Sequence, residues 1–312
     1  MISRRMLRIK VIKTLYAHLK SESDSLMASQ KTLVNSIDKT YDLYVLTLSL
    51  VAELAHYAEQ RQELAKKKQL PTYEDLNPNR KFVDNRVVQL IANSDSVNDY
   101  LASRKLSWAA YPELIKMLYT QLEQTEYFQT YMSQQERSFK DDLALVTEFF
   151  TRELEECEML EDVLDEMSIL WNDDLGFALI MVLRTLSSVR ASHEEIKLVP
   201  KFKSEEDLDF ACELFAKTAV NYDEFQQQIE RFTRNWDVER IAFMDNLIMA
   251  TAVAELVGFE SIPVKVTLDE YIEIAKFYST NSSGTFINGV LDKLVAALQQ
   301  EGRINKSGRG LI

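Results

Sequence analysis

The sequence has 312 residues, of which 46% are hydrophobic and 27% charged, and its net charge at pH 7 is −13. This balance is typical of a soluble globular protein large enough for one big domain or two smaller ones, and the acidity argues against attraction to nucleic acid along the whole chain. Only 7 glycines and 5 prolines occur, which favours long helices over a sheet protein. No apolar run reaches the roughly 18–20 residues of a membrane span. We expect no secretory signal, a cytoplasmic location and two reduced cysteines, Cys157 and Cys212.

The first predicted helix runs from about Ser3 to Lys20 and contains no acidic residue. Its cations are Arg4, Arg5, Arg8, Lys10, Lys13 and Lys20. The three arginines fall inside the apolar arc, so we expect the first turns to overhang the core and leave the guanidinium groups in solvent, with the lysines on the opposite face. Such an end would suit RNA phosphates. The alternative is a plain amphipathic helix with a frayed basic start.

The middle of the chain reads as a series of helices separated by two linkers. A long helix is predicted over 29–68, and the first linker, with two prolines, follows at 70–81. Further helices are expected at about 86–104, 111–124, 127–157 and 160–189, the last of them interrupted at 171–174. A second linker spans 191–206. Three more helices are predicted between residues 207 and 259, and the basic tail 301–312 is expected to be disordered.

Two tryptophans indicate a possible internal repeat. Phe150 lies as far before Trp171 as Phe215 lies before Trp236, and an acidic link and an apolar helix follow each tryptophan. The middle region could therefore be a decayed copy of the C-terminal half. The alternative is that helical hairpins resemble one another by chance.

The segment 262–294 is predicted to be a helix, a polar corner and a second helix. Thr267 is expected to cap the first of these helices, because Glu270 stands at the capping-box spacing. Asn281 to Gly284 form the corner. The residues IPVKVTLDEYIEIAKFYS and FINGVLDKL resemble the C-terminal segment of the NusB transcription-antitermination family. The resemblance extends back to about Asp207 and reappears in residues 3–21.

This resemblance implies an all-α fold of helical bundles and a non-enzymatic role, with no cofactor and no metal. The family binds boxA RNA together with NusE, a small-subunit ribosomal protein. The implied RNA-binding residues are Arg4, Arg5, Arg8, Lys10, Ser282, Thr285 and Phe286, and the implied NusE-binding residues are Tyr16 and Asp245. Phe286 would stack on an unpaired base. Ser282, Thr285 and Ala250 replace charged residues of the family, so this chain lacks some of its RNA contacts.

We therefore predict a NusB-like protein with an additional inserted helical region. The predicted parts are a NusB-like helix at 1–28, the insertion at 29–206, a C-terminal bundle at 207–300 and the tail 301–312. Its expected function is to bind boxA-like single-stranded RNA with NusE in the RNA polymerase antitermination complex and so support transcription of rRNA operons. The alternative is a helical protein–protein adaptor that has lost RNA binding. The rRNA cytosine methyltransferases with a NusB-like domain are disfavoured, because no nucleotide-binding βαβ pattern follows.

Overall fold

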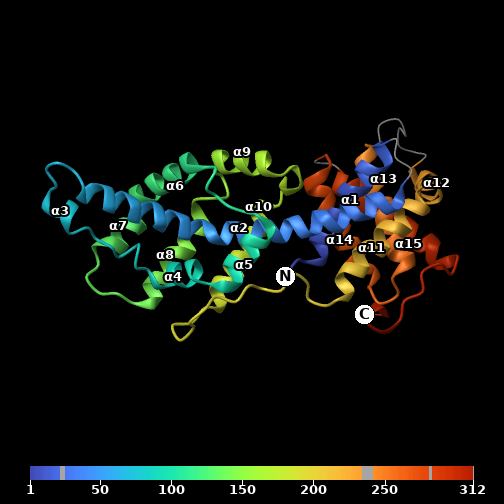
Figure 1. Ribbon diagram of the computed structural model, residues 1–312. Helices are drawn as coiled ribbons and strands as arrows, with labels where there is room; N and C mark the ends of the chain where they lie inside the picture. The colour runs from blue at the N-terminus through green and yellow to red at the C-terminus, as the bar shows by residue number, and fades with distance from the viewer. Residues whose placement is uncertain (22–24, 234–241, 281–282, 312) are drawn as a thin grey trace. The chain divides into compact units, whose positions relative to one another are not determined.

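The computed structural model describes residues 1–21, 25–233, 242–280 and 283–311. In these ranges the chain forms helices and no strand, which confirms the predicted all-α class. None of the helices in these ranges is long and apolar enough to cross a membrane. Contacts divide the chain into two units, shown in Figure 1: unit 1 comprises Met1 and 38–201, and unit 2 comprises 2–37 and 202–312. The description of 29–206 as an insertion stays a prediction.

Unit 1 is organised around the long helix α2 (Leu26–Lys66), which enters this unit at Asp38. Every residue from Thr40 to Val51 is buried, so the helix is covered on all sides there, as expected for the central helix of a bundle. The surrounding elements are α3 (Tyr73–Leu76), α4 (Arg86–Ala92), α5 (Asp95–Arg104), α6 (Pro112–Gln124), α7 (Glu126–Ser133), α8 (Phe139–Arg152), α9 (Glu158–Met167), η1 (Ile169–Trp171) and α10 (Leu175–Ser188).

Polar side chains of the surrounding elements bind α2 directly. Trp108 Nε1 donates to the Leu46 carbonyl at 3.0 Å. Arg104 binds the buried carboxylate of Asp42 with two hydrogen bonds of 2.8 and 2.9 Å. Because bidentate pairs have a fixed geometry, this contact sets the position of α5 along α2.

Two of the long helices predicted for the middle region are in fact broken. The expected helix 86–104 is split into α4 and α5, because the Ser94 side chain caps α5 by accepting from the Val97 amide. The expected helix 127–157 consists of α7 and α8. The interruption predicted at 171–174 is present between η1 and α10. N-capping serines therefore begin new helices at positions where apolar periodicity alone predicts one continuous helix.

Unit 2 is a bundle around α13 (Phe243–Gly258). Residues 247–256 of this helix are all buried, and it packs against five further helices of the unit. These are α1 (Arg4–Lys20), α11 (Glu206–Val220), α12 (Tyr222–Thr233), α14 (Val264–Tyr278) and α15 (Ser283–Gln300). The α1 helix begins as predicted, since the Ser3 side chain accepts from the Met6 amide at 3.2 Å. The first helix of the sequence, α1, thus packs against α11, α13 and α14, which come from the last third of the chain.

Thr267 does not cap α14, contrary to the expectation. The helix begins at Val264, directly after Pro263, and Thr267 lies buried within the first turns. Its hydroxyl donates to the Glu255 carboxylate at 2.9 Å. Proline already ends the preceding segment and fixes a helical φ nearby, so the capping-box pair is not needed.

The tail makes hydrogen bonds with the residues that follow α13, although it was expected to be disordered. The Lys306 ammonium donates to the Phe259 carbonyl at 2.9 Å, and the Ser307 amide donates to the Glu260 carbonyl at 3.1 Å. A short helix, η3 (Gly308–Leu311), follows. The tail therefore satisfies backbone carbonyls just beyond the end of α13.

Candidate nucleic-acid and partner interface

Arg8 lies in the core of unit 2. Its side chain is 3% exposed, and its Nε and Nη2 donate to the two carboxylate oxygens of Glu255 on α13, both at 2.7 Å. The Tyr271 hydroxyl donates to the same carboxylate at 3.1 Å, and Thr267 supplies a fourth hydrogen bond. The expectation that Arg8 reaches solvent is therefore wrong, because a fully buried carboxylate on a neighbouring helix binds it.

The Arg8 guanidinium stays charged and the Tyr271 phenol stays neutral over the physiological range. Burial alone would lower the pKa of Arg8, but the hydrogen bonds and negative charge of Glu255 outweigh it, so the pKa is raised. Burial, and then the Glu255 charge, raises the pKa of Tyr271. A buried pair satisfied in this way holds the helices in register, and its burial keeps the Arg8 guanidinium from contact with RNA. Lys10 is also buried, although we expected it to project outward. We leave both residues out of the interface.

Arg4 and Arg5 keep their guanidinium groups accessible, but each is paired with an acid. Arg4 Nε binds Asp207 at 3.0 Å, and Arg5 binds Glu270 through Nε and Nη2 at 2.8 and 3.0 Å. Accessible ion pairs of this kind contribute about 0–1 kcal/mol. Arg5 can therefore exchange Glu270 for a phosphate at small cost. Asp207 is only 6% exposed, so releasing Arg4 costs more, although two backbone amides also donate to that carboxylate. Both arginines stay candidates.

Asp245 is 6% exposed and joins α13 to the corner between α14 and α15. Its carboxylate accepts from the Ser283 hydroxyl at 3.0 Å and from the Ser279 hydroxyl. We expected Asp245 to present its charge to a partner. This is wrong, because its carboxylate is buried and accepts hydrogen bonds from two serine hydroxyls. Of the other corner residues, Thr285 is exposed and Phe286 is half-buried. Ser282 lies outside the described residues.

We predict that Asp245→Ala destabilises unit 2 by about 1–3 kcal/mol, because it leaves two hydroxyls without their acceptor. Chemical denaturation would measure the loss. Asp269→Ala is the matched control, since Asp269 is an exposed acid on α14 and its removal should change stability by less than about 0.5 kcal/mol. Equal small changes in both variants would contradict the assigned role.

The outward side of α1 carries cations at helical spacing. Arg5, Ile9, Lys13, Tyr16 and Lys20 follow one another at intervals of three or four residues, and none is buried. We call these five residues the α1 stripe. The Lys20 ammonium lies 4.1 Å from the centre of the Phe243 ring, and the Lys13 ammonium lies 5.3 Å from the Tyr278 ring. Cation–π contacts leave the positive charge in place, so the stripe stays basic on an acidic protein.

Tyr16 lies on the α1 stripe where a partner can reach it. Its side chain is 42% exposed, and its ring meets Phe243 edge to face at a centroid distance of 5.4 Å. Tyr16 was predicted from the sequence to face the partner, but Phe243 beside it was not predicted. Many apolar helices begin with an aromatic residue, so Phe243 does not stand out in the sequence. Its contact with Tyr16 joins residues 227 positions apart, which local patterns do not reveal.

Phe277 is a second exposed aromatic residue that was not predicted from the sequence. It is 81% exposed on the last turn of α14. The neighbouring Tyr278 lies against Lys13, and Lys276 pairs with Glu273. Periodicity could have found it, because Tyr271, Ile274 and Ala275 already supply the buried face of the helix.

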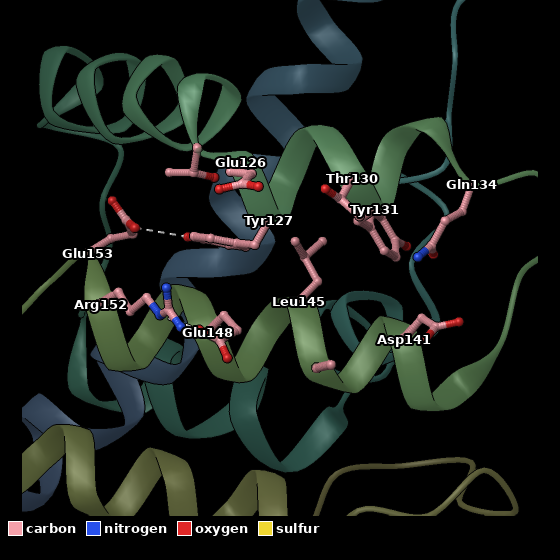
Figure 2. Close-up of a pocket in the computed structure, with 12 residues that line it drawn as sticks. Glu126, Tyr127, Thr130, Tyr131, Gln134, Asp141, Leu145, Glu148, Arg152 and Glu153 are labelled. Carbon is pink, nitrogen blue, oxygen red and sulfur yellow. Dashed lines mark hydrogen bonds and ion pairs between the residues drawn. The ribbon is translucent and has the colours of Figure 1, made fainter.

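Unit 1 contains a groove of about 560 Å³ between α7 and α8, shown in Figure 2. The Tyr127 hydroxyl donates to Glu153 at 3.0 Å, and Gln121 binds the other oxygen of that carboxylate at 2.9 Å. Arg152 pairs with Glu148. Since the donors and acids of the groove pair with one another in this way, we assign no ligand to it.

The described ranges therefore form an all-helical protein with a basic, aromatic surface on unit 2. A family model described as "NusB family" matches residues 178–296. "Transcription antitermination protein NusB" of Salinibacter ruber is 46% identical over 114 residues, covering 36% of this chain and 71% of the relative. The proteins of that name from Chloroherpeton thalassium and Natranaerobius thermophilus are 32% and 33% identical, over 42% and 27% of this chain and 66% and 61% of their own lengths. The chain belongs to the NusB family.

No significant match was found among solved structures. The family match begins within α10, earlier than the resemblance at Asp207, and it ends within α15. It does not include α1. That helix nevertheless packs against α11, α13 and α14, so the described structure joins it to the matched helices.

Proposed function

We propose that this protein is a non-catalytic transcription antitermination factor that binds boxA-like single-stranded RNA together with NusE. It would act in the RNA polymerase antitermination complex and support transcription of rRNA operons. The relatives named transcription antitermination protein NusB support this role. The observation that carries the proposal is the α1 stripe, a run of cations and aromatic contacts on the bundle that matches the family.

In this proposal, Arg4 and Arg5 exchange their carboxylates for RNA phosphates, and Lys13 and Lys20 add positive charge along α1. Thr285 offers a hydroxyl beside Phe286, whose ring stacks on an unpaired base. Tyr16, with Phe243 behind it, forms the NusE contact. An acidic chain then binds RNA through one local surface, with binding that weakens as salt rises.

The test is a titration of labelled boxA-like RNA at several salt concentrations, with and without NusE. We expect affinity to fall with salt, because phosphate contacts release counterions. We also expect NusE to increase the affinity, because in this proposal the protein and NusE bind the RNA together, and such coupling is reciprocal. No RNA binding under either condition would contradict the proposal.

We predict that Phe286→Ala lowers RNA affinity by about tenfold, as expected when a stacking ring is lost. Ile287, Val290 and Leu291 fill the buried face of α15 without it, so thermal stability should fall little. Both quantities are measured on the same preparation. A large stability loss with unchanged affinity of the folded protein would make Phe286 a packing residue.

The second candidate is a protein–protein adaptor. Two observations favour it: Arg8 and Lys10 are buried, and Arg4 and Arg5 are each paired with an acid. An adaptor would bind NusE without any RNA. The titration separates the two functions, because only an RNA-binding protein gives a salt-dependent RNA signal.

A further inference from the structure

Phe277 has no packing role that explains an aromatic ring at its position. The buried residues of α14 are Thr267, Tyr271, Ile274 and Ala275, and Phe277 lies on the flank of this buried face with 81% of its surface in solvent. It shares that side with Glu270 and Glu273, which precede it at helical spacing. An exposed ring of this size, backed by a rigid helix, offers a free aromatic face.

The surroundings of Phe277 suit a polyanion better than an apolar partner. Glu270, two turns before it and about 10 Å along the helix axis, holds Arg5. Glu273 holds Lys276, and Lys13 lies against Tyr278. Cations therefore flank the ring, and the two glutamates beside it are already neutralised. These exposed pairs can exchange a carboxylate for a phosphate at small cost.

Phe277 also lies at the end of α14 that meets Phe286. A methyl group added at Gly284 would lie 3.4 Å from the Lys276 side chain, so the last turn of α14 touches the first turn of α15. Ser279 and Ser283 both bind Asp245, which fixes the two helix ends in place. Two aromatic residues, one exposed and one half-buried, are thus held at one corner of the bundle.

We propose that Phe277 is a base-stacking residue that takes an unpaired base of the same single-stranded RNA. This inference rests on the proposed function. Aromatic stacking is tolerant of sequence because every base has a π-face, and it is typically combined with a basic groove that follows the backbone. Here Arg5, Lys13 and Lys276 supply the cations around the ring. Phe277 would extend the RNA surface from the corner onto the outer face of α14.

The test compares the full-length chain with its Phe277→Ala and Phe277→Trp variants, using labelled boxA-like RNA as the probe. Phe277→Ala should weaken binding about tenfold, and Phe277→Trp should restore it, because the indole also stacks. The salt dependence should be the same in all three proteins, since the ring carries no charge. Melting temperature should not change, because the side chain is exposed. Tyr73→Ala is the matched control, as Tyr73 is a 77% exposed aromatic residue on α3 of unit 1.

Two outcomes would overturn the inference while leaving the proposed function intact. In the first, the wild-type protein binds RNA and Phe277→Ala binds it equally well. In the second, Phe277→Ala loses only NusE binding, which would make the ring a protein contact. If the wild-type protein binds no RNA with or without NusE, the inference and the proposed function both fail.

Discussion

Arg8→Ala should destabilise unit 2 by about 3–5 kcal/mol, the loss expected when one partner of a buried ion pair is removed. The substitution leaves the Glu255 carboxylate buried among Tyr271 and Thr267 without its counter-charge. Hydrogen exchange of α13 together with chemical denaturation would measure this. Arg5→Ala is the matched control on the same helix, because its ion pair is exposed and should contribute only about 0–1 kcal/mol.

A double substitution separates the ion pair from simple packing. Arg8→Met combined with Glu255→Met removes both charges and keeps apolar volume, so it should cost less than the sum of the two single changes. Additive losses would mean that the two residues act independently. Similar small losses for Arg8→Ala and Arg5→Ala would place Arg8 at the surface and return it to the candidate RNA contacts.

Trp171→Ala should destabilise unit 1 by about 3–5 kcal/mol, as for other large buried side chains replaced by alanine. The ring is 3% exposed, and its Nε1 donates to the Lys39 carbonyl of α2 at 2.7 Å. The change therefore removes both packing and an anchor on the central helix. Ile169→Ala in the same short helix is the control, because that side chain is 83% exposed and should change stability little.

A near-neutral Trp171→Ala would mean that η1 is not part of the core of unit 1. The buried state of Trp171 agrees with one half of the suggested internal repeat. Its counterpart, Trp236, lies outside the described residues, so the repeat stays a prediction.

The sequence by itself determined the helical class, the family and most helix positions. Scarce glycine and proline and apolar residues at helical spacing are local properties. They predicted α1, α2 and α6 to within a few residues, and three helices in the region of α11–α13. The polar run at 171–174 correctly marked a break. The break at Ser94 was missed because a single capping serine is a weak signal beside continuing apolar periodicity.

Only the tertiary structure decided which charged residues are available to a ligand. Arg8 and Lys10 lie on a helix whose opening is rich in cations, and nothing local distinguishes them from Arg5. The distinction comes from Glu255, 247 residues away, which buries and neutralises Arg8, whereas Glu270 holds Arg5 at the surface. Periodicity reports which side of a helix is apolar, but the neighbouring helix determines whether a charge on that side is paired in the core or exposed. Neighbouring helices likewise decide that the Asp245 carboxylate is buried and binds two serines of the corner, and that Phe277 is exposed.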